Sequence, residues 1–260
     1  MGNKSNDSEI KKFFSRCWVE EDRLYLADEA LARTMFVEVK ERISAAGGKW
    51  QGGKKQYFLF PFSAEKTRLS LELGDWVNFK QDNQFFETPE EVIALMALFA
   101  DVEKGHDILE PQAGRFAIGK WLQEYCVTYD NQPIDCYELN EYNQDYLRGL
   151  PLANLLGGDF LQASPSHKKY DVILSNPPFA NFADIDHITH MTKFLKPNGI
   201  IVSVASFSWQ KSISKKAAAF RGFLSQQSRH EVTNLDPEAF KSTGTKVATC
   251  IVTINGTDYF

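Results

Sequence analysis

The sequence predicts an α/β protein with a doubly wound, mostly parallel sheet and a small N-terminal α+β appendage. From residue 107 onward, short apolar stretches alternate with helical ones, which is typical of parallel strands joined by covering helices. A length of 260 residues accommodates one such domain and a smaller module. Hydrophobic residues make up 43% of the chain, so both parts can bury a core.

Residues 10–80 are expected to form the small module, after a disordered tail over residues 1–9. The apolar residues of 31–43 recur every four positions, which predicts a helix that Gly47 and Gly48 end. The other elements expected in this module are strands at 49–51 and 56–60, around a Gly-Gly turn, and a helix at 64–73.

Residues 81–260 are expected to form the larger domain, which starts with a helix over 90–100. Thr88 is expected to cap this helix, with Pro89 in its first turn and Glu91 as the partner in a capping box. The further strands are expected at 107–109, 134–137, 155–156, 172–174, 200–204 and 248–254, and the further helices at 116–124, 140–149 and 184–195.

The composition argues against several classes of protein. No run approaches 18 apolar residues, so no membrane span is expected, and the polar N-terminus lacks the apolar core of a signal peptide. The four cysteines are scattered without a CxxC pair, which predicts reduced thiols, no metal site and a cytoplasmic location. His187 and His190, on one expected helix, are interpreted as packing or surface residues rather than metal ligands.

Two clusters of basic residues stand out against a net charge of −5. Residues 40–68 hold seven basic and two acidic residues, and residues 211–229 hold five basic and no acidic ones. Such clusters are either solvated surface or nucleic-acid contacts. The rings of the 49–60 hairpin either join its cations in such a contact or form the core of a small cap. The candidate nucleic-acid contacts are Lys49, Trp50, Lys54, Lys55, Lys211, Lys215, Lys216 and Arg221.

Asn176-Pro177-Pro178-Phe179 follows the apolar run 170–175 and is the most informative motif of the chain. The prolines restrict the backbone and remove two amide donors. The Asn176 amide oxygen and a neighbouring backbone carbonyl can then accept hydrogen bonds from a planar amine, and Phe179 offers a face for an aromatic ring. These four residues are therefore the candidate catalytic residues for chemistry on an exocyclic amine.

A second constellation follows the first two strands of the expected sheet. Glu110-Pro111-Gln112-Ala113-Gly114 comes after the first strand, where nucleotide-like ligands bind in doubly wound sheets. Gly114 permits close approach of the backbone to a ligand, and Glu110 can pair with a ligand ammonium. Glu138 follows the second strand, where a carboxylate can bind two ribose hydroxyls. A helix-start acid is the alternative for Glu138.

The Asn-Pro-Pro-Phe motif resembles that of the S-adenosylmethionine (SAM)-dependent amino-methyltransferases, and the 110–114 loop resembles their acidic-Pro-x-x-Gly loop. The resemblance covers about residues 83–256 and extends to Phe86-Glu87-Thr88-Pro89, similar to a segment that touches the cofactor's methionine part in bacterial and phage DNA adenine methyltransferases. It implies a Rossmann-like methyltransferase sheet. The cofactor-binding residues it implies are Thr88, Pro89, Glu110, Pro111, Ala113, Gly114, Glu138, Asp159 and Phe160, the last two at the adenine. Phe116 departs from the pattern, because the family usually has a second Gly there.

The implied activity is transfer of a methyl group from SAM to N6 of adenine in DNA, on a base flipped out of the duplex. A restriction-modification or mobile-element role and a separate specificity or restriction chain go with that family. Methylation of RNA, at guanine N2 or adenine N6, stays open. A glutamine-methylating enzyme is less favoured because such enzymes usually have Tyr where Phe179 stands. A catalytically weak SAM- or nucleic-acid-binding module is the alternative that Phe116 supports.

Overall fold

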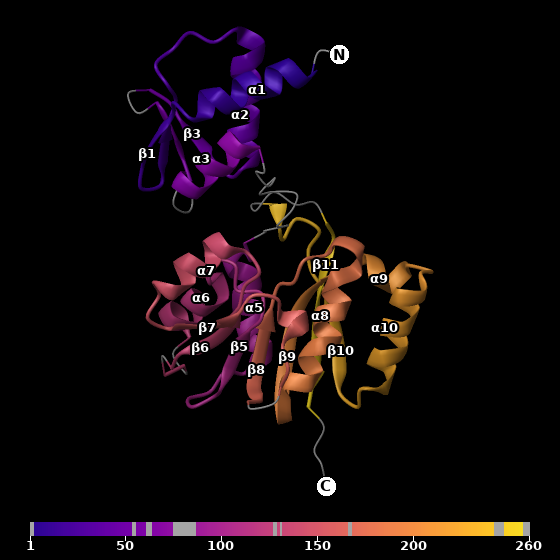
Figure 1. Ribbon diagram of the computed structural model, residues 1–260. Helices are drawn as coiled ribbons and strands as arrows, with labels where there is room; N and C mark the ends of the chain where they lie inside the picture. Colours follow the sequence, from indigo (N-terminus) through magenta and orange to yellow (C-terminus); the bar gives the residue numbers. More distant parts are fainter. Residues whose placement is uncertain are drawn as a thin grey trace. The chain divides into compact units, whose positions relative to one another are not determined.

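A computed structural model describes residues 3–53, 56–60, 64–74, 87–126, 129–130, 132–165, 168–241 and 247–256, with the side chains of residues 3–6 left out. The chain divides into two compact units, residues 1–85 and residues 86–260. Both can be followed by their labels in Figure 1. Each unit has its own sheet.

The N-terminal unit has a four-stranded antiparallel sheet in the order β1-β2-β4-β3. Its strands are β1 (Trp18–Glu20), β2 (Arg23–Tyr25), β3 (Lys49–Gln51) and β4 (Tyr57–Leu59). Its helices are α1 (Asn3–Phe14), α2 (Arg33–Ala45) and α3 (Ala64–Leu73). Leu24 and Phe58 are paired across β2 and β4 and are fully buried. These two side chains mark the sheet face that carries the core.

Helix α1 corrects one expectation, because it includes residues 3–9, which we expected to be disordered. The apolar end of this helix explains the difference. Ile10, Phe13 and Phe14 are all buried, at most 1% exposed. Burial of three large side chains on one helical face stabilises the polar turn that precedes them.

The larger unit confirms the predicted α/β class with a mostly parallel sheet. Its seven strands lie in the order β10-β11-β9-β8-β5-β6-β7. The five strands from β9 to β7 are parallel, whereas β11 runs antiparallel to both β9 and β10. The strands are β5 (Ile108–Glu110), β6 (Ile134–Tyr137), β7 (Ala153–Gly157), β8 (Tyr170–Ser175), β9 (Leu195–Ser206), β10 (His230–Asn234) and β11 (Thr249–Asn255).

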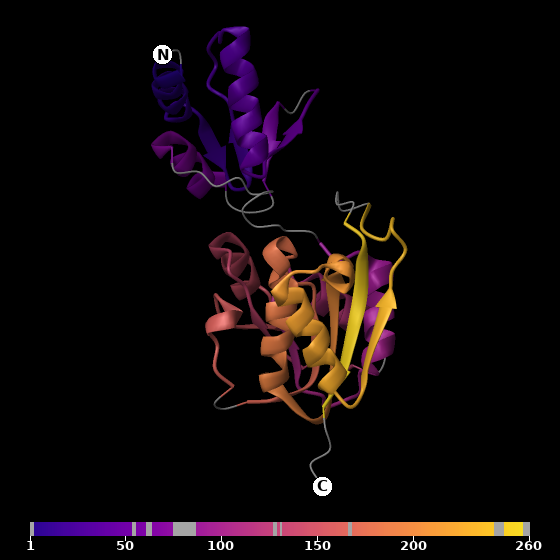
Figure 2. The ribbon, with the colours of Figure 1, turned by 90° about the vertical axis from the view of Figure 1, so that its right-hand side faces the viewer.

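Helices cover both faces of this sheet, as a parallel sheet requires. One core cluster combines sheet residues with residues of α5 (Glu90–Ala100), α6 (Ala117–Tyr125) and α7 (Glu141–Arg148). The other combines them with residues of α8 (Ala183–Met191), α9 (Ser208–Lys211) and α10 (Lys215–Gln226). In the side view of Figure 2, α8 and α10 lie on one face of the sheet and α5 on the other. The described residues of this unit also include three 3-10 turns: Phe160–Gln162, Ala180–Phe182 and Thr192–Phe194.

Strand β8 illustrates how the sequence specifies this architecture. From Val172 to Ser175 every residue is buried, on both faces of the strand. Only a central strand covered by helices on both sides can bury a continuous apolar run of this kind. The catalytic candidate Asn176 follows directly, so the core holds it at the carboxyl end of the central strand. Within the described residues, no helix is long and apolar enough to cross a membrane.

Candidate active site

The candidate residues gather at the carboxyl edge of the parallel strands. Glu110 ends β5, Glu138 follows β6 and Asn176 follows β8. Because these strands are parallel neighbours, their ends meet at one edge of the sheet. Asp159 follows β7 by two residues and belongs to the same edge.

Glu138 fastens the loop after β5 to the end of β6. One oxygen of its carboxylate accepts a hydrogen bond from the Gly114 backbone N–H at 2.7 Å, and the other accepts from the Asn140 N–H at 2.8 Å. Burial raises the pKa of Glu138. Gly114 has φ 54°, a left-handed conformation that glycine adopts at little cost. The Glu138 carboxylate, for which the sequence predicted a ribose contact, therefore holds the loop after β5 in place.

Glu110 lies deeper than the sequence suggested. It is 3% exposed, and one of its carboxylate oxygens accepts a hydrogen bond from the Gly119 N–H at 3.1 Å, in the first turn of α6. Burial, with a smaller effect of the Glu138 charge, raises its pKa well above the ordinary value. The structure thus places Glu110 against a helix N-terminus, where the peptide dipoles favour a carboxylate. The neighbouring loop residues Pro111 and Ala113 are buried.

Phe116 turns its ring into the core. Its backbone has φ 65°, the left-handed conformation that the usual glycine would supply. The ring is 1% exposed and lies over Gly119, so closely that a Cβ atom at residue 119 would collide with ring carbon Cζ. Gly119 thus provides the space for the ring. The ring packs among the α5–α6 side chains of the core.

Asn176 and Thr88 lie in contact although 88 positions separate them. The Asn176 side-chain Nδ2 donates a hydrogen bond to Thr88 Oγ1 at 3.0 Å. Thr88 is 7% exposed, and α5 begins after Pro89, which is also buried, without a side-chain cap. The expected capping role of Thr88 is therefore wrong, because its hydroxyl serves the Asn176 amide instead. With Nδ2 held in this way, the amide oxygen of Asn176 is the group that can accept from an amine.

The other motif residues lie against the core. Pro177 is buried, while Pro178 and Phe179 are half-buried. Phe179 packs beside the α5–α6 core cluster. Asn181 and Phe182, which follow the motif, both have left-handed backbones with φ 54° and 57°. Lys216 donates a hydrogen bond to the Asn181 carbonyl oxygen at 2.8 Å and so secures this turn.

A part-buried polar chain connects β8, the loop after β5 and α8, and sequence reasoning missed it. Ser175 Oγ donates to the Gln112 amide oxygen, and Gln112 Nε2 donates to His187 Nδ1 at 2.8 Å. His187 is 8% exposed, and burial lowers its pKa to about 4. The imidazole is neutral at pH 7, with its proton on Nε2, because Nδ1 accepts. Only the polar character of Gln112 and Ser175 beside the motifs hinted at this chain.

Of the two expected adenine contacts, Asp159 lies at the surface and Phe160 lies in the core. Asp159 is exposed, and its carboxylate accepts a hydrogen bond from the Leu161 N–H at 2.9 Å. Phe160 is 2% exposed and packs among Tyr137, His187, His190 and Phe194, so its ring presents no open face. Leu139, directly after Glu138, is 73% exposed and is an apolar surface that the sequence prediction omitted.

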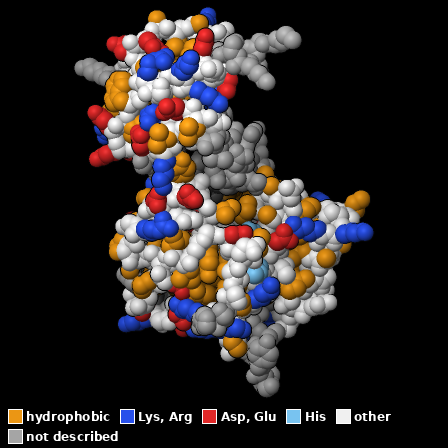
Figure 3. Space-filling model, viewed as in Figure 1, with side chains coloured by type: hydrophobic (Ala, Val, Ile, Leu, Met, Phe, Trp, Pro, Cys, Tyr) orange, Lys and Arg blue, Asp and Glu red, His pale blue; other side chains and the backbone are white. Residues whose placement is uncertain are grey.

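The predicted basic contacts are dispersed. Lys216 pairs with Asp186, and Arg221 donates to the backbone oxygens of Trp209 and Ser212. Lys211 lies over the Phe207 ring, and Lys215 is exposed. Lys54 and Lys55 lie outside the described residues. On the face shown in Figure 3, basic and acidic side chains are interspersed.

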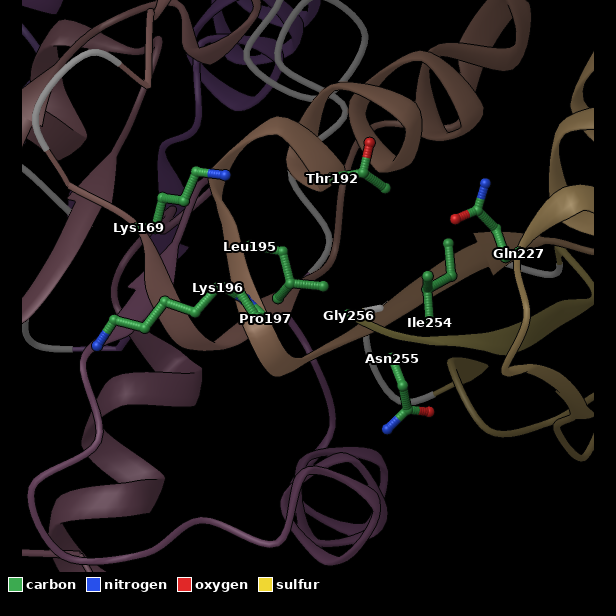
Figure 4. A pocket seen from close by; sticks show the side chains of 9 residues that line it. All are labelled: Lys169, Thr192, Leu195, Lys196, Pro197, Gln227, Ile254, Asn255 and Gly256. Atoms are coloured by element: carbon green, nitrogen blue, oxygen red, sulfur yellow. The ribbon is translucent and has the colours of Figure 1, made fainter. Parts of the chain in front are cut away.

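A surface pocket lies at the opposite edge of the sheet and takes no part in this site. Its lining combines the starts of β8 and β9 with the end of β11 (Figure 4). Lys196 on its rim is already paired with Asp107 and Asp171. Among the described residues, no group of three or more His, Cys, Asp or Glu is placed to hold a metal ion.

Comparisons with known proteins agree with this fold. No family model matches the chain. An rRNA methyltransferase of Streptomyces thermotolerans is 32% identical over 106 residues, 39% of this chain and 33% of that protein. The chain thus spans about a third of the length of this curated relative.

Two solved structures share the fold at low sequence identity. A provisionally assigned class I SAM-dependent methyltransferase of Listeria monocytogenes is 17% identical, with a TM-score of 0.53, over 76% of this chain and 70% of that chain. The type I restriction-modification methyltransferase subunit of Streptococcus thermophilus is also 17% identical, with a TM-score of 0.53, over 66% and 45%. The fold is therefore that of SAM-dependent methyltransferases, which supports SAM as the cofactor.

Proposed function

We propose that this protein transfers the methyl group of SAM to the N6 amine of adenine in DNA. The observation that carries the proposal is the position of Asn176, at the carboxyl end of β8, with its amide oriented by Thr88. In that position the amide oxygen can accept a hydrogen from an exocyclic amine. Holding the amine in the reactive orientation is the main contribution that the protein makes to such a reaction.

The residues at the carboxyl edge fit the cofactor. Glu138 and Gly114 hold the loop after β5 against β6, and the Phe116 ring occupies the core rather than the loop surface. We assign the ribose hydroxyls to Glu138, and the adenine to Asp159 and the exposed Leu139. When bound, SAM supplies an electrophilic methyl group. Thr88, Pro89, Pro111 and Ala113 line this region in the proposal, and Glu110 supports it through α6.

Asn176 and Phe179 hold the target base in this proposal. Asn176 and a backbone oxygen beside it accept the two amine hydrogens, and the Phe179 ring stacks on the base. These bonds turn the nitrogen lone pair toward the methyl carbon. With SAM bound, its methyl group would pass to this nitrogen, the demethylated cofactor would leave, and the amine would release a proton to water. No strong base is needed, because the nitrogen is cationic when the proton leaves.

RNA is the second candidate substrate, at adenine N6 or guanine N2. The identity with an rRNA methyltransferase over 106 residues favours it. A non-catalytic binding module loses its main support, because Phe116 packs in the core. We also propose a separate specificity or restriction chain as partner, since few residues between Phe179 and β9 are available to recognise a target sequence.

The test is transfer of tritium from labelled SAM to unmethylated duplex DNA and to RNA, with nucleoside analysis of each product. We expect N6-methyladenine in DNA. Asn176→Ala should abolish transfer while SAM affinity changes only a few-fold, because the amide touches the amine and not the cofactor. If only RNA became labelled, RNA would be the substrate in place of DNA. Loss of SAM binding together with transfer would refute the assigned role of Asn176.

A further inference from the structure

Helix α2 and the edge strand β3 of the N-terminal unit can be followed in Figure 1, and side chains of both form an exposed patch of rings and cations. Phe36 and Trp50 are 39% and 41% exposed. The Lys40 Nζ lies between them, 5.4 Å from the Phe36 ring centroid and 5.2 Å from that of Trp50. Helical spacing places Arg33 and Val37, both exposed, on the same side of α2. We call Arg33, Phe36, Val37, Lys40 and Trp50 the α2–β3 patch.

The cations of the α2–β3 patch have no acidic partner in the part of the chain that the structure describes. No carboxylate there lies within ion-pair distance of Arg33 or Lys40, whereas several other cations of the unit are paired. Those pairs are Lys11–Asp7, Arg16–Glu29, Arg42–Glu38 and Arg68–Glu65. Glu41 is next to Lys40 in the sequence, but it is about 100° round the helix axis from Lys40 and so lies on another side of α2. The patch therefore combines positive charge that no described carboxylate neutralises with two part-exposed rings, of which Trp50 also packs against Phe58 at a tilt of 56°.

This combination suits a nucleic-acid strand whose bases are unpaired. Exposed rings stack on base faces, which are accessible only outside a duplex, and cations neutralise the phosphates alongside. Lys49 alternates with Trp50 along β3 and belongs to the other sheet face.

We propose that the α2–β3 patch binds single-stranded DNA by stacking bases on Trp50 and Phe36. The choice of DNA rests on the proposed function, whereas stacking of unpaired bases rests on the patch alone. The patch adds Phe36 and Lys40 of α2 to a contact that the sequence placed in the hairpin. It gives the N-terminal unit a substrate-holding role separate from the chemistry at Asn176.

The same unit contains a matched control in Trp18, on the opposite edge strand β1. Trp18 is 49% exposed, slightly more than Trp50. However, its ring is stacked on Tyr25, with centroids 5.0 Å apart and an interplanar angle of 2°. The end of β1 and the turn after it are acidic, Glu20-Glu21-Asp22, and Glu20 accepts a hydrogen bond from the Tyr25 hydroxyl. Trp18 therefore has one face covered by a parallel ring and lies beside acidic residues, whereas Trp50 meets Phe58 at a tilt of 56° and lies beside Lys40.

The experiment is fluorescence anisotropy of the full chain with a labelled DNA strand of about 20 nucleotides, long enough for such sites. We expect Trp50→Ala and Phe36→Ala each to weaken binding about 5- to 100-fold, the usual loss for one stacked base. Lys40→Gln keeps both rings and should lower the salt slope of binding by about 0.7. Trp18→Ala should bind like the wild type. Circular dichroism confirms that each variant folds.

The outcomes separate this inference from the proposed function, because binding requires neither SAM nor transfer. Unchanged binding by Trp50→Ala and Phe36→Ala would overturn the proposal, and so would an equal loss in Trp18→Ala. Tighter binding of the same sequence as duplex would overturn base stacking. Tighter binding as RNA would overturn the assignment to DNA. Trp50-dependent binding of an acidic peptide in preference to DNA would make the patch a protein-docking surface instead.

Discussion

Thr88 acts on the site through a single hydrogen bond, which decides how the Asn176 amide is turned. Thr88 Oγ1 accepts from Nδ2, so this hydrogen bond holds the amide with its oxygen turned away from Thr88. A flipped amide would present a donor to the substrate amine. Thr88 is thus a positioning residue for the catalytic candidate.

We predict that Thr88→Val lowers kcat about 5- to 30-fold, because loss of one such bond costs about 1–2 kcal/mol. The KM for SAM should change little. Thr88→Ser keeps the hydroxyl and should restore most of kcat. Steady-state kinetics with varied SAM provide the measurement. A raised KM for SAM at constant kcat would instead make Thr88 a direct cofactor ligand.

At the scale of elements, Phe116 and Gly119 pack as a complementary pair at the start of α6. The ring fills the space that the missing side chain of Gly119 leaves, and the Gly119 N–H holds Glu110. The left-handed backbone of Phe116 costs about 1–2 kcal/mol, which burial of a phenyl ring more than offsets. The pair explains how a phenylalanine can occupy a position usual for glycine.

We predict that Gly119→Ala lowers the free energy of unfolding by about 1–3 kcal/mol, the usual cost of overpacking. The same substitution should cost much less in a Phe116→Ala background, where the ring is absent. Urea unfolding of the four proteins of this double-mutant cycle measures the coupling. Additive effects would show that the ring does not occupy the space beside Gly119.

His187 makes the stability of the larger unit depend on pH. Burial lowers its pKa from 6.5 to about 4, while the charges of Asp159 and Asp186 act in the opposite direction. Between these pKa values the unfolded chain binds a proton that the folded chain does not. Stability contributed by neutral His187 is therefore complete above pH 6.5 and is lost as the pH falls toward 4.

We predict that the wild type loses about 2 kcal/mol more than His187→Gln when the pH is lowered from 7 to 5. The comparison cancels the contributions of the buried carboxylates, which both proteins share. Urea unfolding at the two pH values gives the difference. Equal losses in the two proteins would contradict a depressed pKa for His187.

At the scale of the whole molecule, the two units have separate sheets and separate cores. We predict that calorimetric unfolding shows two transitions, one for each unit. SAM should raise the temperature of only the transition that belongs to residues 86–260. At 100 times its dissociation constant the cofactor should add about 2.7 kcal/mol to that unit. Gly119→Ala identifies the transition independently. A shift of both transitions together would show that the units unfold as one.

The sequence predicted the central strands and the helices between them, because their apolar residues stand out, but it missed helix α10 (Lys215–Gln226) and the start of α1. The expected strand 172–174 lies within β8, and the expected helix 90–100 coincides with α5. Strand β10 was missed since none of its five residues is buried, so no hydrophobic pattern marks it. Strands β1 and β2 are three residues each, too short to show a period.

It follows from the sequence which residues come after which strands, and hence that Glu110, Glu138 and Asn176 share one edge of the sheet. Local periodicity and parallel topology suffice for that placement. The side-chain contacts are seen only in the folded structure. Glu110 contacts the first turn of α6, Asn176 contacts Thr88, and the Phe116 ring packs over Gly119. Side-chain direction depends on packing between segments far apart in the chain, and no local pattern contains that information.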